Sequence, residues 1–114
     1  MGTPFYERLD APASREQKAI LAKAGPKNLQ IAQLAGEPVI AVETTAPGGG
    51  APLGGVRVRT RNGWFAARPS GTEEVYKIYA ESFLSRDHLQ HIQRDAQALI
   101  GGLFERAGGE PQPD

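Results

Sequence analysis

The sequence contains no cysteine, which excludes a disulfide framework, a cysteine-based zinc site, an iron–sulfur cluster and a cysteine nucleophile. It also has no excess of one charge, because 13 Lys and Arg residues balance 13 Asp and Glu residues. A nucleic-acid binder driven by bulk positive charge is therefore excluded. No apolar run reaches the roughly 18 residues of a membrane-spanning helix, and the N-terminal residues lack the basic and apolar regions of a secretory signal. We expect a cytoplasmic protein with no membrane or nucleic-acid partner.

The length of 114 residues allows a single domain. Glycine and proline are abundant, with 14 and 9 residues respectively, which is typical of a chain with several turns. We divide the chain into an extended lead-in at 1–13, a folded domain at 14–106 and a tail at 107–114. The tail is predicted to be disordered because it has almost nothing to bury.

Two segments have the pattern of helices. Ser14 and Gln17 form a capping box ahead of strong helix formers that stop at Gly25-Pro26, so we predict a helix over about 14–24. Residues 26–35 predict no more than a short helical turn. A last helix follows Ser85, and its apolar stripe at spacings of three or four consists of Leu89, Ile92, Ala96, Leu99, Ile100 and Leu103.

Four segments are rich in β-branched, aromatic or alternating residues and are predicted strands: 38–45, 56–61, 64–68 and 75–83. Asn62-Gly63 predicts a two-residue type I′ turn with positive φ angles. The glycine-rich stretch Gly48–Gly55 predicts a flexible loop, because it has no Lys-Ser/Thr of a nucleotide-binding loop. The predicted fold belongs to the α+β class, with a four-stranded, largely antiparallel sheet and helices packed on one face.

The segment from Arg68 to Thr72, Arg-Pro-Ser-Gly-Thr, has the chemistry of a phosphate seat. An arginine at a strand end can clamp two phosphate oxygens, the Ser70 and Thr72 hydroxyls are donors, and Gly71 lets successive N–H groups converge on an anion. Lys77, further along the next strand, adds a point charge. The same five residues also fit a tight turn whose hydroxyls bond their own backbone, and composition alone leaves both interpretations open.

The longer run from Gly63 to Phe83, GWFAARPSGTEEVYKIYAESF, resembles the C-terminal, fourth domain of the α-D-phosphohexomutases, and within them the bacterial phosphoglucomutases. FYERLDAPASREQKAILAKAG and LAGEPVIAVETTAPG resemble other parts of the same domain, so the resemblance covers roughly residues 3–105. It implies that Arg68, Ser70, Gly71, Thr72 and Lys77 hold the non-reacting phosphate of a phosphosugar. It also implies a glucose 1-phosphate to glucose 6-phosphate interconversion through a phosphoserine enzyme and glucose 1,6-bisphosphate.

The family's phosphoserine, magnesium and sugar loops are missing from this sequence. We therefore expect no catalytic residue and no cofactor in this chain, with Mg²⁺ implied only for a complete enzyme. The expected partners are a phosphosugar and the other domains of the same enzyme, and the chain alone is expected to be inactive. A phosphomannomutase or phosphoglucosamine mutase remains an alternative within the family.

Four further patterns have both a functional and a structural interpretation. His88 and His91 lie three residues apart and could share a metal, but without a third ligand we interpret them as solvated. Arg57, Arg59 and Arg61 beside Trp64 and Phe65 could bind RNA, although the neutral net charge favours a solvated sheet face. A stand-alone phosphate- or RNA-binding interaction module is therefore the alternative from another class. Glu73-Glu74 is interpreted as exposed, and the aromatic residues, Tyr76 and Tyr79 among them, as core or rim packing.

Overall fold

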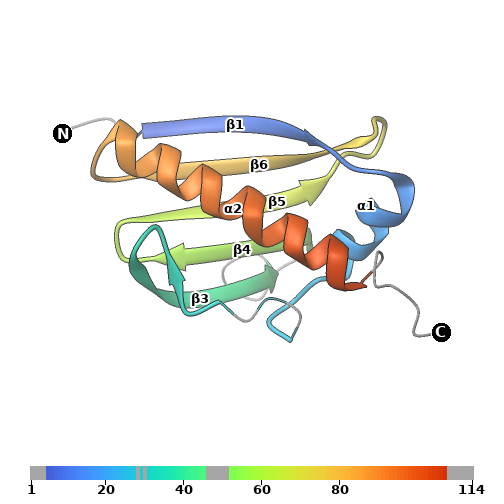
Figure 1. Cartoon of the computed structure of the whole chain (residues 1–114), viewed down its shortest axis with the longest axis horizontal. Helices are drawn as coiled ribbons and strands as arrows, with labels where there is room; N and C mark the ends of the chain where they lie inside the picture. Colours follow the sequence, from blue (N-terminus) through green and yellow to red (C-terminus); the bar gives the residue numbers. More distant parts are fainter. Residues whose placement is uncertain (1–4, 28, 30, 46–51, 108–114) are drawn as a thin grey trace.

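The structure is a computed structural model that describes residues 5–27, 29, 31–45 and 52–107. Those residues form one antiparallel sheet of six strands in the order β1-β6-β5-β4-β3-β2, together with two helices (Figure 1). The elements in chain order are β1 (Phe5–Pro12), α1 (Arg15–Ala22), β2 (Gln33–Leu34), β3 (Glu37–Thr45), β4 (Pro52–Thr60), β5 (Gly63–Pro69), β6 (Val75–Ser82) and α2 (Arg86–Ala107).

One face of the sheet is buried beneath the helices. Helix α2 crosses β5 and β6, and α1 packs on β4 and β5 and against α2 (Figure 1). Alternate residues of the central strands point into this layer, because side chains in a strand alternate between faces. The fully buried core side chains include Val56, Val58, Phe65, Ile78, Leu21, Leu89, Ile92 and Ile100. The α+β class is confirmed, and among the described residues no helix covers the opposite face of the sheet.

The sheet has six strands and not the predicted four, because both of its edges were missed. The predicted lead-in contains β1, which pairs antiparallel with β6 from Phe5↔Ser82 to Pro12↔Val75. Phe5, Leu9 and Ala11 are the less exposed side chains of β1, but the charged Glu7 stands among them on the same face and interrupts the apolar alternation that marks a half-buried strand. This strand therefore forms because it pairs with β6, and the pattern of its own sequence does not predict it.

The opposite edge, β2, lies where a short helical turn was predicted. Gln33 and Leu34 pair instead with β3, and Ala35 and Gly36 turn the chain with φ angles of 52° and 81°. Two consecutive positive φ angles are the signature of a type I′ hairpin turn. Leu29 and Leu34 are buried against the core. The apolar residues whose spacing suggested a helical turn therefore pack the segment that leads into this hairpin.

The β4–β5 hairpin is confirmed, but its predicted type I′ turn is wrong. Neither Asn62 nor Gly63 has a positive φ, and the two residues between the strands are Arg61 and Asn62. Glycine at 63 meets a packing constraint instead, because a Cβ there would lie 2.8 Å from the Glu81 carbonyl oxygen and still closer to the Ile92 side chain. Part of the predicted glycine loop, Gly54 and Gly55, belongs to β4, and residues 46–51 lie outside the described residues.

Both helices begin where their caps were predicted. In α1 the Ser14 Oγ accepts from the Gln17 amide at 3.2 Å, and the Gln17 side chain accepts from the Ser14 amide at 2.9 Å. In α2 the Ser85 Oγ accepts from the His88 amide at 3.0 Å. Helix α2 extends to Ala107, and the rest of the predicted disordered tail, 108–114, lies outside the described residues. In the described part of the chain, neither helix combines the length and the apolar character needed to cross a membrane.

The packing at Gly63 is testable by adding one methyl group. We expect Gly63→Ala to lower the free energy of unfolding by about 1–3 kcal/mol, because the new Cβ overpacks the contact with β6 and α2. Urea titration followed by circular dichroism measures the change. Gly101→Ala is the matched control: a Cβ there meets nothing within 4 Å, so this helical substitution should raise stability by roughly 0.5–1 kcal/mol. Equal effects at the two positions would contradict the packing argument.

Candidate functional site

The predicted phosphate seat is the turn that joins β5 to β6, residues 70–74, at the end of the sheet next to α1 (Figure 1). Its base is closed by the Ser70 amide, which donates to the Val75 carbonyl at 3.0 Å. The Ser70 side chain is buried, and its Oγ accepts from the amides of Thr72 at 3.3 Å and Glu73 at 3.1 Å. Ser70 therefore holds the turn in shape from inside, which is the self-bonded arrangement that composition had left open.

The turn still leaves polar groups on its outer side. In the described part of the chain, the amides of Gly71 and Glu74 and the hydroxyl of Thr72 make no hydrogen bond. A Cβ built on Gly71 would meet nothing within 4 Å, so the space beside its Cα is open. Such unpartnered donors on an exposed turn can bind an anion.

Two cations lie on the strands that lead into and out of the turn. Arg68 of β5 and Lys77 of β6 are directly opposite each other in the antiparallel register, so their side chains share the helix-free face of the sheet. Neither makes an ion pair or a hydrogen bond with the rest of the described residues. On its other side Lys77 faces Asp10 of β1, whose carboxylate lies 3.5 Å from Arg8. Because like charges directly opposite repel, an anion between the two cations would relieve a local electrostatic cost.

The turn is tied to α1 by contacts that no local pattern signals. The Nζ of Lys18 donates to the carbonyl oxygens of Ser70 at 3.2 Å and Glu73 at 2.7 Å. Just before α1, the Ala13 amide donates to the Glu74 carbonyl at 3.0 Å. Lys18 was missed in the sequence because more than 50 residues separate it from its partners.

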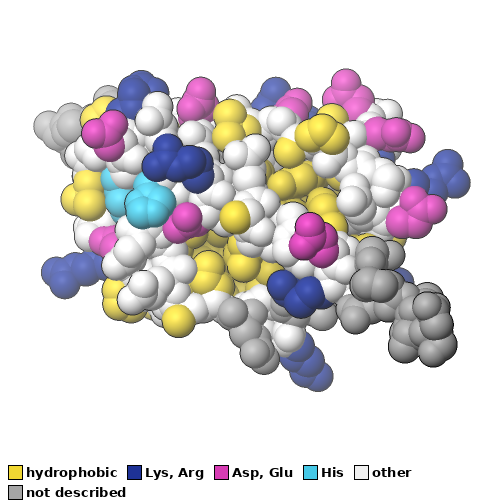
Figure 2. All heavy atoms as spheres, in the orientation of Figure 1, with side chains coloured by type: hydrophobic (Ala, Val, Ile, Leu, Met, Phe, Trp, Pro, Cys, Tyr) yellow, Lys and Arg dark blue, Asp and Glu magenta, His cyan; other side chains and the backbone are white. Residues whose placement is uncertain are grey.

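The acidic pair that follows Thr72 is exposed as predicted. Glu73 and Glu74 form no ion pair with the other described residues, and Figure 2 shows acidic side chains gathered at this end of the molecule. They leave the local charge less positive than Arg68 and Lys77 alone would make it. An anion bound here needs close, directed hydrogen bonds, because the surrounding field alone does not attract it.

The helix-free face of the sheet also carries a hollow of about 340 Å³, lined by Tyr6, Arg57, Trp64, Ala66, Arg68 and Tyr79. The Arg57 guanidinium lies 4.9 Å from the centre of the Trp64 ring, and Arg59 pairs with Glu43 at 3.0 Å. These two arginines are half-buried by those contacts and are not simply solvated, whereas Arg61 beyond β4 is exposed. Trp64 and Tyr79 sit at the rim of the hollow, and Phe65 and Tyr76 are buried in the core.

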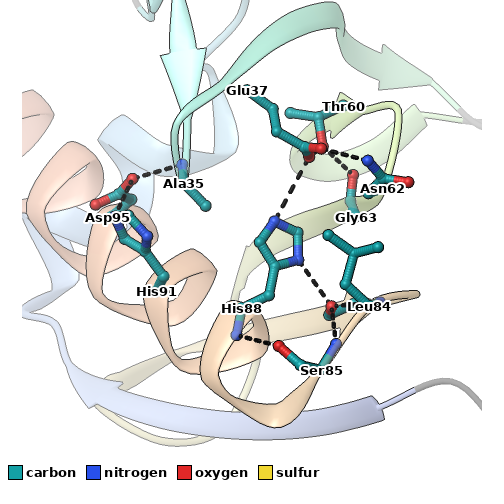
Figure 3. A network of polar contacts seen from close by, with 11 residues as sticks. Ala35, Glu37, Thr60, Asn62, Gly63, Leu84, Ser85, His88, His91 and Asp95 are labelled. Atoms are coloured by element: carbon teal, nitrogen blue, oxygen red, sulfur yellow. Dashed lines mark hydrogen bonds and ion pairs between the residues drawn. The ribbon is translucent and has the colours of Figure 1, made fainter.

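The prediction that both histidines are solvated is wrong for His88 (Figure 3). Its side chain is only 11% exposed, its Nδ1 lies 2.7 Å from the Ser82 Oγ, and its Nε2 lies 3.5 Å from Glu37. His91 is half-exposed and lies 3.7 Å from Asp95, one turn along α2. The sequence could not show the burial of His88, because β3 and β6 supply its partners.

The order Ser82, His88, Glu37 resembles a hydrolase triad, but the burial of Ser82 argues against that chemistry. Ser82 is fully buried, and its Oγ accepts from the amides of Leu84 at 3.0 Å and Ser85 at 3.3 Å. Both lone pairs are therefore used, and its hydrogen is left to donate to His88. The network anchors the start of α2 to the sheet, since Glu37 also accepts from Thr60 at 2.8 Å and from Asn62.

Comparison of the sequence with known proteins identifies its family. Residues 16–99 match the family described as phosphoglucomutase/phosphomannomutase, C-terminal domain. The chain belongs to this family. Over 107 residues it is 57% identical to a phosphoglucomutase from Komagataeibacter xylinus, covering 94% of this chain and 19% of that relative. The chain thus spans about a fifth of the length of the curated relative it matches, and the resemblance of the sequence to this domain is confirmed.

The Glu37 network makes a pH-dependent contribution to stability that can be measured. Burial acts to raise the pKa of Glu37, but hydrogen bonds from Asn62 and Thr60 and the nearby His88 together lower it below its usual value. A carboxyl whose pKa is lower in the folded state stabilises the fold above its unfolded pKa, and this stabilisation is lost as the pH falls through the folded pKa. We therefore expect Glu37 to contribute to a fall of the unfolding midpoint in urea below about pH 4.3, the ordinary pKa of a glutamic acid.

In Glu37→Gln that acid-induced decline should become shallower, because residue 37 no longer takes up a proton. Glu105→Gln, an exposed carboxyl on α2, is the control and should retain the wild-type slope. If the pH profile of Glu37→Gln were as steep as that of the wild type, the lowered pKa would not be a source of stability.

Proposed function

We propose that the 70–74 turn, together with Arg68 and Lys77, holds the phosphate of a phosphosugar for a phosphoglucomutase of which this chain is the C-terminal domain. The observation that carries the proposal is the pair of unneutralised cations, Arg68 and Lys77, beside a turn whose outward amide and hydroxyl have no partner in the described chain. Membership of the family and the similarity to a named phosphoglucomutase support it independently.

In this proposal each group has a separate task. Arg68 offers a planar fork that can donate two parallel hydrogen bonds to phosphate oxygens. The Gly71 amide and the Thr72 hydroxyl add single donors, and Lys77 adds a point charge. Ser70 is buried with its oxygen committed to the turn, so its main contribution is to set the turn's shape, and only its hydroxyl hydrogen remains for a ligand.

Such a site recognises a phosphate and not the sugar ring that carries it. It would therefore accept a hexose bisphosphate in either orientation, which an interconversion of glucose 1-phosphate and glucose 6-phosphate through glucose 1,6-bisphosphate requires. The contribution to rate is positioning, because binding energy at the remote phosphate holds the reacting end in place. We assign glucose phosphates over mannose or glucosamine phosphates from the similarity to a phosphoglucomutase, and we place the enzyme in the cytoplasm.

The phosphoryl-transfer chemistry is proposed to reside in other parts of the enzyme. Within the described residues, no three His, Asp or Glu side chains lie close enough together to share a metal ion. The residues present therefore do not fit the Mg²⁺ that the family implies, and we assign this chain no step that depends on it. We also expect this chain to bind the other domains of the same enzyme.

One consequence is that this chain alone does not turn over substrate. Purified residues 1–114 incubated with glucose 1-phosphate, glucose 1,6-bisphosphate and Mg²⁺ should form no glucose 6-phosphate above the buffer rate. A coupled dehydrogenase assay detects the product, and a complete phosphoglucomutase serves as the positive control. Measurable turnover by the chain would overturn the division of labour proposed here.

The phosphate seat itself is tested by a matched pair of arginine substitutions. Titration with glucose 1-phosphate, followed by amide NMR, should shift the Gly71 and Thr72 signals. Arg68→Ala should weaken the apparent affinity by about tenfold or more, because charge-assisted hydrogen bonds are worth about 1.5–3 kcal/mol. Arg61→Ala removes the same charge from an exposed site at the β4–β5 turn and should change the affinity less than twofold.

Two results would contradict the assignment of this seat. One is an equal loss of affinity in both arginine variants, which would indicate attraction by net charge alone. The other is a response to a single-stranded oligonucleotide at Arg57, Arg59 and Trp64 with none to the phosphosugar at the turn. That result would favour the alternative of an RNA-binding module.

A further inference from the structure

Lys18 lies outside the phosphate seat and contacts it with its side chain. Its ammonium lies between two carbonyl oxygens of the turn, 3.2 Å from that of Ser70 and 2.7 Å from that of Glu73. The start of α1 is held by the Ser14–Gln17 capping box, and the Lys18 amide donates to the Ser14 carbonyl at 2.9 Å. The ammonium therefore extends from a fixed backbone position.

These two contacts determine which way two peptide groups of the turn face. No described peptide bond is cis, and in a planar trans peptide the C=O and the following N–H point in opposite directions. With the Ser70 and Glu73 carbonyls directed at Lys18, the N–H groups of Gly71 and Glu74 must point away from it. Those are the two amides of the turn that have no partner among the described residues.

The remaining amides of the turn are held differently. Those of Thr72 and Glu73 bond to the Ser70 Oγ, and that of Ser70 bonds to Val75. If Lys18 were absent, nothing else described in the structure would hold the Ser70 and Glu73 carbonyls, and either peptide could rotate. A rotated peptide would present a carbonyl oxygen where the anion approaches, and that contact is repulsive.

We propose that Lys18 is a positioning residue for phosphate binding. It keeps the outward N–H groups of the turn facing the ligand by holding the Ser70 and Glu73 carbonyls on the other side of the turn. This inference rests on the proposed function for its ligand. The orientation of the peptides can be tested without any ligand.

The experiment compares Lys18→Met, Lys18→Arg and the control Lys23→Met in the 114-residue chain. Lys23 is the C-cap residue of the same helix, it is exposed, and its side chain makes no contact among the described residues. Its replacement by Met therefore removes the same charge without removing a contact to the turn. Each variant is titrated with inorganic phosphate and with glucose 1-phosphate, and the amide signals of Gly71, Thr72 and Glu74 are followed by NMR. Residual dipolar couplings of the free proteins report the orientation of the Gly71 and Glu74 N–H bonds.

We expect Lys18→Met to weaken phosphate binding by about tenfold, the equivalent of one charge-assisted bond, and to change the couplings of Gly71 and Glu74. Lys18→Arg, which can still donate to both carbonyls, should recover most of the affinity. In Lys23→Met the affinity should stay within twofold of the wild-type value. The couplings should equal those of the wild type within error. Urea unfolding of each variant shows whether a loss reflects global destabilisation.

Unchanged affinity and unchanged couplings in Lys18→Met would overturn the proposal, as would an equal loss of affinity in Lys23→Met. If the wild-type chain binds no phosphate, the proposed function fails, yet the couplings still decide whether Lys18 orients the turn. A changed affinity that Lys18→Arg does not recover, with unaltered couplings, would also contradict a positioning role.

Discussion

Burial of one face of the sheet is the constraint on which the rest of this structure depends. Side chains from β4, β5 and β6 alternate, and the inward set must meet the apolar stripe of α2 and the buried Leu21 of α1. A shift of one residue in any of these strands would send its core side chains to solvent. The same register places Arg68 and Lys77 next to each other on the face that no helix covers. The packing of the hydrophobic core thus fixes where these two cations lie.

The 70–74 turn is held in shape by the protein itself and still has donors that can bind a ligand. Ser70 and Lys18 form hydrogen bonds with the inner amides and carbonyls of the turn. The turn therefore keeps its shape without a bound anion. Its outer groups remain without partners in the described chain, and binding an anion would therefore require little reorganisation. A site prepared in this way loses less binding energy to ordering than a flexible loop does. This arrangement costs free energy, because two neighbouring cations repel each other. The packing of the core offsets that repulsion.

At the start of α2 a buried polar network stabilises the fold. His88 connects Ser82 to Glu37, and Glu37 in turn holds Thr60 and Asn62 (Figure 3). This arrangement fastens the start of α2 to the strands and keeps the helix over the core. Its resemblance to a catalytic triad is one of residue type only, since the Ser82 oxygen is enclosed and already accepts two amides. Burial and hydrogen-bond count, and not residue identity, separate the two interpretations.

The sequence by itself determined the features that depend on neighbouring residues: the two helix caps, the four inner strands, the β4–β5 hairpin and the Arg68–Thr72 motif with its family. These follow from short-range backbone bonding and periodicity, which a linear pattern records. Only the tertiary structure decided that Phe5–Pro12 is an edge strand, that Gln33 and Leu34 form a hairpin with β3, and that Lys18 holds the turn. It likewise decided that His88 is buried and that Gly63 is needed for packing. Apart from the β2–β3 hairpin, whose paired residues are only three to five positions apart, each of these features depends on partners far away in the chain. The energy of such contacts exists only once the sheet has brought the partners together.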